Sequence, residues 1–179
     1  ANFNQFFTVK VGTIMPANIA ICAGSFDPPS YGHLNIIGRA LKVCDKVTVA
    51  IATDNSKSSL FTAQERVDIL KELFKDEPRV EIDCFEGLLV SYAKEKKANV
   101  LIRGIRSVAD YEFELQMSLA NRMLDSEIET VFMMTEGHLS HISSSIIKQI
   151  IQLGGSAKKM VHPFVEQQLK DKIFGKGKE

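Results

Sequence analysis

The chain has 179 residues, of which 45% are hydrophobic and 25% are charged, as in an ordinary globular protein with a core of its own. Its 22 Lys and Arg residues equal its 22 Asp and Glu residues, so no overall charge favours nucleic acid or an anionic membrane, and a phosphate site must be built locally. No apolar stretch approaches the roughly 18 residues of a membrane span, and we expect a cytoplasmic protein.

The first 14 residues do not fit the pattern that follows them. We interpret them as a leader that was introduced for expression or is disordered. The alternative is a natural extension that packs on the domain. Residues 15–179 are expected to form a single domain that ends in a helix. Three cysteines, Cys22, Cys44 and Cys84, lack the CxxC or histidine spacing of a zinc site, and we expect them to be buried thiols in a reducing compartment.

Strands and helices alternate along the rest of the chain. Continuous apolar runs at residues 19–23 and 47–52 predict strands buried on both faces, and helical spacing over residues 33–43 predicts the crossover between them. Thr62 and Glu65 have the form of a capping box at the start of the next helix, and Pro78 follows its end. Strands are then predicted at 80–84, 100–102 and 130–134, and helices at 87–97, 111–124, 143–153 and 163–174.

This alternation predicts an α/β fold, namely a doubly wound, open parallel sheet of Rossmann-like type in a single domain. In such sheets, ligands bind at the carboxyl ends of the strands. Polar and basic clusters that follow the predicted strands are therefore the candidates for function.

The first such cluster occupies residues 24–33, with the sequence GSFDPPSYGH. Gly24 lets the backbone turn, the two prolines stiffen the loop, and Gly32 lets a phosphate approach the N–H groups of a helix N-terminus. His33 would face that phosphate. The alternative is a proline-rich turn with a histidine that is satisfied within the fold.

This string resembles the GTFDPxTxGH signature of the bacterial phosphopantetheine adenylyltransferases, a family of nucleotidyltransferases with HxGH-type motifs. Ser25 and Ser30 stand where that family usually has Thr, and both keep a hydroxyl. The resemblance extends with unbroken motif spacing from about residue 19 to residue 145. It implies reversible transfer of an adenylyl group from ATP to 4′-phosphopantetheine, which gives dephospho-coenzyme A and pyrophosphate in coenzyme A biosynthesis.

Lys57 lies in a polar loop after the second predicted strand, where a cation could meet a phosphate. Most loop lysines are simply solvated, which is the alternative. The resemblance implies that Lys57 bridges the phosphate of phosphopantetheine and the α-phosphate of ATP. It also implies that Ser25 orients the attacking phosphate and that Ser25, Phe26 and His33 lie in the ATP site.

Arg103 and Arg106 follow the predicted strand at 100–102. Guanidinium groups bind phosphate oxygens through paired hydrogen bonds, and Gly104 allows close approach of the backbone between them. The alternative is that these arginines form ion pairs with nearby acidic residues, namely Asp110, Glu112 or Glu114. The resemblance implies that Arg103 contacts the phosphopantetheine phosphate and that the ATP site includes Gly104, Ile105, Arg106 and Glu114. Asp110 is then expected to hold one of the arginines in place.

Ser143, Ser144 and Ser145 precede an apolar helical pattern, and Ser143 is a good N-cap residue. Three hydroxyls and the free N–H groups of a helix start can hold the β- and γ-phosphates of ATP. The string resembles the ISSS motif of the family. The predicted ATP site also takes in the residues just before it, namely Leu139, Ser140, His141 and Ile142. None of the serines is interpreted as a nucleophile, because no base is arranged beside them.

Leu89 matches a family position whose backbone contacts the pantetheine arm; the alternative is a buried helix residue. The apolar side chains of the 111–124 helix, including Phe113 and Met117, are interpreted as core or subunit interface. No metal site is expected in the protein, because His138, His141 and His162 lack ligand spacing, and Mg²⁺ is expected to arrive with ATP. The resemblance further implies a homohexamer that coenzyme A inhibits by competing at the site.

The predicted chemistry depends on position and charge. His33, Lys57 and Arg106 are the predicted catalytic residues, which stabilise negative charge without a covalent intermediate. The rival readings are a nicotinate- or nicotinamide-mononucleotide adenylyltransferase, a cytidylyltransferase, and a nucleotide-binding sensor without catalysis. Zero net charge argues against nucleic-acid binding.

Overall fold

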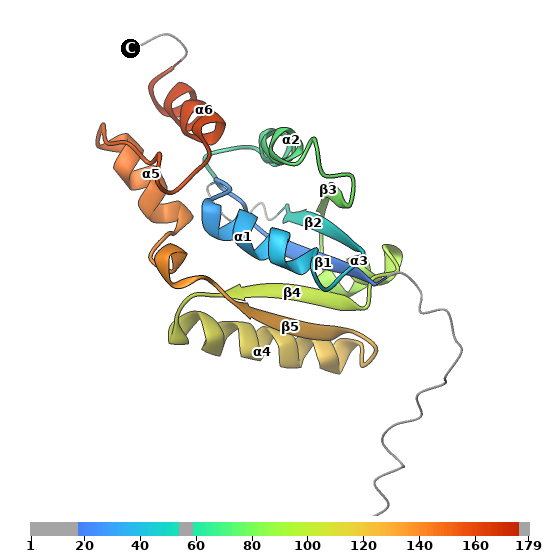
Figure 1. Cartoon of the computed structure of the whole chain (residues 1–179). Coiled ribbons are helices and arrows are strands. Elements are labelled where there is room, and N and C mark those ends of the chain that lie inside the picture. Colours follow the sequence, from blue (N-terminus) through green and yellow to red (C-terminus); the bar gives the residue numbers. More distant parts are fainter. Residues whose placement is uncertain (1–17, 54–58, 176–179) are drawn as a thin grey trace, which may run out of the picture.

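A computed structural model describes residues 18–53 and 59–175 of the chain. Five parallel strands form one sheet in the order β3-β2-β1-β4-β5 (Figure 1). The strands are β1 (Ile19–Gly24), β2 (Lys46–Ala52), β3 (Val80–Phe85), β4 (Val100–Ile105) and β5 (Glu129–Met134). The order reverses direction between β1 and β4, so the two halves of the sheet grow outward from this pair. The predicted open parallel sheet is thereby confirmed.

Helices cover both faces of this sheet. They are α1 (Tyr31–Ala40), α2 (Ala63–Leu73), α3 (Leu89–Glu95), α4 (Val108–Leu124), α5 (Ser144–Gln152) and α6 (Pro163–Phe174). Alternate residues of the central strands point to opposite faces. In β1, Ala20 and Cys22 belong to the cluster with α1 and α2, whereas Ile21 belongs to the cluster with α3. A strand with cover on both faces needs a continuous apolar run, which is the pattern in the sequence.

A third cluster lies beyond the carboxyl ends of the strands and joins α2, α5 and α6. Its fully buried members include Ile147 and Ile151 of α5 and Val165 and Leu169 of α6. The Tyr31 N–H donates to the Met160 carbonyl at 2.9 Å, which connects the start of α1 to the segment before α6. In Figure 1, α5 and α6 lie together at one side of the molecule, as this cluster requires.

The structure differs from the predicted boundaries by up to three residues, and the difference that concerns the candidate site is in β4. This strand continues through Arg103 and Gly104 to Ile105, because all three residues pair with β5. Gly104 fits there for a steric reason: a Cβ atom would lie 3.0 Å from Cγ1 of Ile36. The first arginine is therefore part of the strand, while Arg106 is just beyond it.

The prediction of three buried thiols is wrong for Cys84. Cys22 is buried and Cys44 is partly buried, but Cys84 is exposed because β3 is an edge strand. The predictions for the leader at residues 1–14 and for Lys57 lie outside the described residues. Within the described part of the chain, no helix is both long enough and apolar enough to cross a membrane.

Candidate active site

A cavity of about 380 Å³ opens where the strand order reverses, at the carboxyl ends of β1 and β4. This is the position at which open α/β sheets bind ligands. Its wall comes from the loop between β1 and α1, the end of β4, and the segment that leads into α5. The predicted residues in the wall are Ser25, Phe26, His33, Arg103, Gly104, Arg106, Glu114, Leu139, Ile142, Ser143, Ser144 and Ser145.

Three residues predicted for the ATP site, Ile105, Ser140 and His141, do not line this cavity. Ile105 is buried, with 2% of its surface exposed, and it ends β4. The Ser140 hydroxyl donates to the Gly137 carbonyl at 2.8 Å within a single 3₁₀ turn. His141 is exposed. Each is adjacent in the chain to a residue of the cavity wall, but the side chains of consecutive residues in a strand or turn point in different directions.

A hydrogen bond from the loop between β1 and α1 fixes the tautomer of His33, which lies in the first turn of α1. The Ser30 N–H donates to Nδ1 of His33 at 3.0 Å, so this nitrogen carries no proton and Nε2 is the N–H donor. Burial lowers the pKa of His33 to about 4, and the positive charges of Arg106 and Arg103 act in the same direction. At neutral pH, His33 is therefore an uncharged hydrogen-bond donor in the cavity wall.

Phe26 packs its ring against that of His33. Its φ of 48° is unusual for a residue with a side chain, and it turns the ring back under the loop. The ring centroid lies 5.0 Å from that of His33. A Cβ atom at Gly24 would lie 3.1 Å from the Phe26 ring, so the glycine makes room for this arrangement.

Both arginines carry the ion pairs that the sequence left open as an alternative. Arg103 donates from Nε and Nη2 to the Glu114 carboxylate at 2.7 and 2.5 Å, and its Nη1 donates to the Ala23 carbonyl. Arg106 donates from Nε to Asp110 at 2.9 Å and from Nη1 to the Ile142 carbonyl at 2.9 Å. Because the guanidinium groups still line the cavity, pairing fixes their position and leaves them beside any bound anion.

Two serines at the start of α5 have structural roles: Ser143 caps the helix, and Ser144 connects it to the first loop. Ser143 accepts a hydrogen bond from the Ile146 N–H at 3.2 Å, so the predicted N-cap is confirmed. The Ser144 hydroxyl donates to the Pro28 carbonyl at 2.9 Å and joins α5 to the first loop. Ser145 is exposed. The three residues thus bring the N-terminus of α5 to the cavity, where its dipole favours anions.

A second cavity, of about 680 Å³, adjoins the first. Arg103 and Glu114 line both cavities, so their ion pair stands at the boundary between them. The second cavity also contains Leu89, as well as Phe113 and Met117 of α4, which the sequence suggested as core or interface. All 17 residues of α4 remain at least partly exposed, and the helix covers the sheet less closely than its apolar content suggests.

Several wall residues were missed by the sequence analysis. Thr135 lines the first cavity directly after β5, and its position after an apolar strand was a usable signal. The second cavity also includes polar residues without a motif, namely Thr53, Ser118, Asn121 and Thr130. These residues come from different elements and line one cavity because of the way α4 packs on the sheet. The sequence alone does not reveal that packing.

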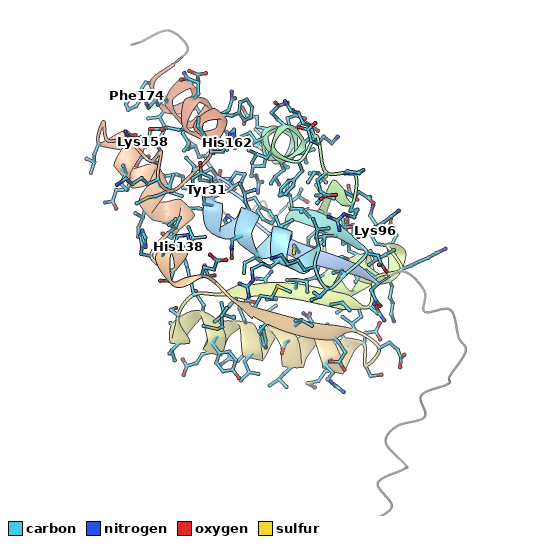
Figure 2. All side chains as sticks on the ribbon, viewed as in Figure 1. Tyr31, Lys96, His138, Lys158, His162 and Phe174 are labelled. Carbon is cyan, nitrogen blue, oxygen red and sulfur yellow. The ribbon has the colours of Figure 1, made fainter. Side chains whose placement is uncertain are left out.

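Histidine and acidic residues do not gather as metal ligands in the parts of the chain that the structure describes. Residues 18–53 and 59–175 contain no group of three or more His, Cys, Asp or Glu side chains placed to hold an ion. His138 and His162 lie on separate elements, on the 3₁₀ turn and at the start of α6 (Figure 2).

Comparison with known proteins places this geometry in a family. A family model described as cytidylyltransferase-like matches residues 21–150. The phosphopantetheine adenylyltransferase of Geobacter sulfurreducens is 46% identical over 161 residues, which cover 90% of this chain and 98% of that protein. A crystal structure from Vibrio parahaemolyticus, assigned as a nicotinate-nucleotide adenylyltransferase, has a TM-score of 0.65 at 16% identity and covers 90% of this chain and 97% of its own. That last similarity shows the fold alone. By its family match and its identity to a full-length relative, the chain belongs to the phosphopantetheine adenylyltransferases among the cytidylyltransferase-like nucleotidyltransferases.

Proposed function

We propose that the chain transfers an adenylyl group from ATP to 4′-phosphopantetheine in coenzyme A biosynthesis, giving dephospho-coenzyme A and pyrophosphate. One observation carries the proposal: two adjoining cavities share a single guanidinium, that of Arg103. A transfer between two phosphate-bearing substrates requires their phosphates to meet, and a shared cation at the boundary offsets the repulsion between them.

The first cavity suits ATP. It combines a neutral N–H donor on His33, the guanidinium of Arg106 and the N-terminus of α5. The β- and γ-phosphates would lie at Ser143, Ser144 and Ser145, where N–H groups and hydroxyls are available. ATP would bring Mg²⁺ bound to its own phosphates, as nucleotide-dependent transferases commonly use it.

The second cavity suits the pantetheine arm, which is long, flexible and mostly apolar between its amides. Leu89, Phe113 and Met117 offer apolar contacts, and Thr53 and Asn121 offer polar ones. With the arm in this cavity, the terminal phosphate would reach Arg103. We propose that Lys57 bridges this phosphate and the α-phosphate of ATP, as the family resemblance implies.

The reaction needs no covalent intermediate. An oxygen of the acceptor phosphate forms a bond to the α-phosphorus of ATP, and the bond from that phosphorus to the bridging oxygen breaks. Pyrophosphate leaves with the electron pair. Ser25 would orient the attacking phosphate, His33 would donate from Nε2 to the α-phosphate, and Arg106 would stabilise the departing charge. The attacking phosphate is already ionised, so no general base is required.

We further propose that copies of the chain assemble into a homohexamer. Val108 and Met123 of α4 have 78% and 90% of their surface exposed, which leaves large apolar side chains for a second copy to cover. Coenzyme A carries the same arm as the acceptor and would inhibit by competing for the second cavity. Three free cysteines fit the reducing cytoplasm.

Pyrophosphate release from ATP and Mg²⁺ tests the activity when phosphopantetheine, nicotinamide mononucleotide and no acceptor are compared. Release only with phosphopantetheine, with dephospho-coenzyme A identified by mass, supports the proposal. Release with the mononucleotide would move the chain to another substrate within the same chemistry. Tight ATP binding without acceptor-dependent release would indicate a sensor.

A further inference from the structure

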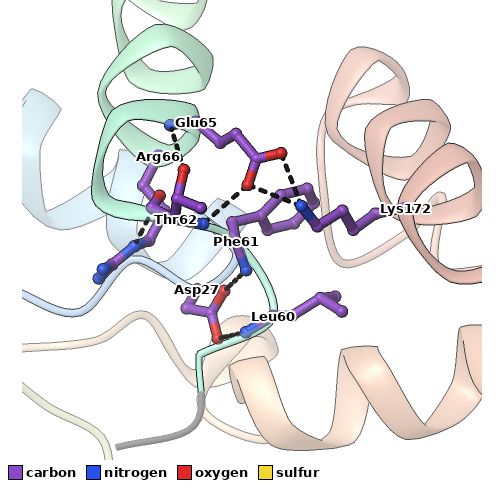
Figure 3. A network of polar contacts seen from close by, with 7 residues as sticks. All are labelled: Asp27, Leu60, Phe61, Thr62, Glu65, Arg66 and Lys172. Carbon is purple, nitrogen blue, oxygen red and sulfur yellow. Dashed lines mark hydrogen bonds and ion pairs between the residues drawn. The ribbon is translucent and has the colours of Figure 1, made fainter. Parts of the chain in front are cut away.

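A buried carboxylate lies beside the first cavity without forming part of its wall. Asp27 has 5% of its surface exposed and accepts three hydrogen bonds, of which Figure 3 shows the two from Leu60 and Phe61. Its Oδ2 and Oδ1 accept from the N–H groups of Leu60 and Phe61, each at 2.9 Å. Lys148 of α5 donates to Oδ2 at 2.8 Å. One side chain thus joins the first loop to the start of α2 and to α5.

We propose that Asp27 is a positioning residue for adenylyl transfer, which fixes the distance between the first loop and the N-terminus of α5. The inference rests on the proposed function, because the loop that Asp27 holds leads directly into α1, which carries His33, while Ser143 to Ser145 stand at the start of α5. These groups would contact the α-phosphate and the outer phosphates of the same nucleotide. Their spacing has to match the length of the triphosphate.

The composition of the loop between β1 and α1 explains why a carboxylate holds it in place. Pro28 and Pro29 carry no N–H, so the loop has two fewer donors and depends more on groups that accept hydrogen bonds. Three of its acceptors are used. The Ser25 carbonyl accepts from Arg66 of α2 at 2.7 Å, the Pro28 carbonyl accepts from Ser144 at 2.9 Å, and the Asp27 carboxylate accepts the remaining bonds.

Charge also favours positioning over ligand contact. A carboxylate near a polyphosphate would repel it unless its charge were neutralised. Burial alone would raise the pKa of Asp27, but the hydrogen bonds from Lys148, Phe61 and Leu60 outweigh it and keep the pKa below the usual 3.8. The group is therefore ionised and compensated at neutral pH. Fixed hydrogen bonds of this kind preserve geometry through the catalytic cycle.

The test is steady-state kinetics of Asp27→Asn beside a matched control. The asparagine keeps the shape and one acceptor but turns an N–H-bearing end toward a donor. We expect kcat to fall about 100-fold, as for a displacement of about 1 Å in a reacting complex, with a smaller change in either KM. Glu166→Gln is the control. Glu166 is also buried, with 8% exposed, and accepts from Ser156 at 2.8 Å and from the Ala157 N–H at 3.1 Å, but it lies on α6, away from both cavities.

We expect Glu166→Gln to lower the melting temperature as Asp27→Asn does while kcat stays within about twofold of the wild type. The role of Asp27 is overturned if Asp27→Asn keeps kcat within threefold, or if the control loses as much kcat. Should Asp27→Asn not fold by circular dichroism, Lys148→Met replaces it, since this variant removes only the link to α5 and leaves both backbone N–H bonds. We then expect about a tenfold loss of kcat, and an unchanged kcat overturns the inference.

The wild-type chain is assayed first, which separates the two proposals. A wild type that releases no pyrophosphate with phosphopantetheine contradicts the proposed function. An active wild type with an unaffected Asp27→Asn variant contradicts only the role of Asp27.

Discussion

The two cavities are built in different ways. The walls of the first are linked directly by hydrogen bonds: Ser144 donates to the Pro28 carbonyl, and Arg106 donates to the Ile142 carbonyl. Asp27, beside the wall, adds a bond from Lys148 of α5. The wall that α4 gives to the second cavity is connected to the strands by two ion pairs, Arg103–Glu114 and the exposed Arg122–Glu129, and every residue of α4 is at least partly exposed. A triphosphate needs rigid, charged surroundings, whereas a flexible apolar arm tolerates an adaptable wall.

Arg103 belongs to both cavities, and its removal should have the largest effect. Arg103→Met deletes the shared cation and leaves the largely buried Glu114 carboxylate without its partner. We expect kcat/KM for phosphopantetheine to fall about 1000-fold, since a preorganised charge and its paired hydrogen bonds are lost together. Initial rates at varied acceptor concentration measure this. A loss confined to KM for ATP would assign Arg103 to the first cavity alone.

His33 tests the rigid cavity by itself, and two substitutions separate its two nitrogens. Asn at position 33 keeps an acceptor where Nδ1 accepts from the Ser30 N–H but has no donor at the place of Nε2. We expect His33→Asn to lose about 100-fold in kcat, the usual cost of one donor to a developing charge. His33→Gln, which keeps a donor near Nε2, should lose only about tenfold. Equal losses in both variants would contradict the donor role.

The strands, the helices and the capping box at Thr62 could all be predicted from the sequence, because buried parallel strands and amphipathic helices leave regular apolar patterns. The phosphate-binding candidates could be predicted for a related reason, since they follow the strands in the chain. The sequence could not choose the partners of Arg103 and Arg106, because Asp110 and Glu114 are both within reach on one helix. It also could not separate the cavity face of α4 from the rest of its exposed surface, because both carry apolar side chains.

Phe113 tests the adaptable cavity. Its side chain lines the second cavity from α4, and 61% of its surface is exposed. We expect Phe113→Ala to raise KM for phosphopantetheine about tenfold, from the loss of part of one aromatic contact, while kcat and KM for ATP stay near the wild-type values. Titration of coenzyme A should show a parallel loss of inhibition. If the KM for ATP rises instead, the assignment of the two cavities is wrong.

The partly buried histidine of the first cavity should also appear in the pH dependence of folding. The pKa of His33 is about 4 in the folded chain against 6.5 as its ordinary value, so the unfolded chain binds more protons between these two values. The stability from the neutral ring is complete above pH 6.5 and is lost as the pH falls toward 4. Urea unfolding at pH 7 and pH 5 should show a larger loss for the wild type than for His33→Asn, and equal losses would contradict the low pKa.

The smallest effect is expected at Thr53, which supplies one of the hydrogen bonds across the floor of the second cavity. Its hydroxyl donates to the Phe85 carbonyl at 2.9 Å and connects the ends of β2 and β3. Thr53→Val keeps the shape and removes this bond, so the stability should fall by about 1 kcal/mol and the melting temperature by about 2–4 °C. If the second cavity is adaptable, KM for phosphopantetheine should rise only about threefold and kcat should not change. A loss of kcat as large as that of Asp27→Asn would mean that both cavities depend on fixed geometry, because a single hydrogen bond far from the reacting phosphates would then control the rate.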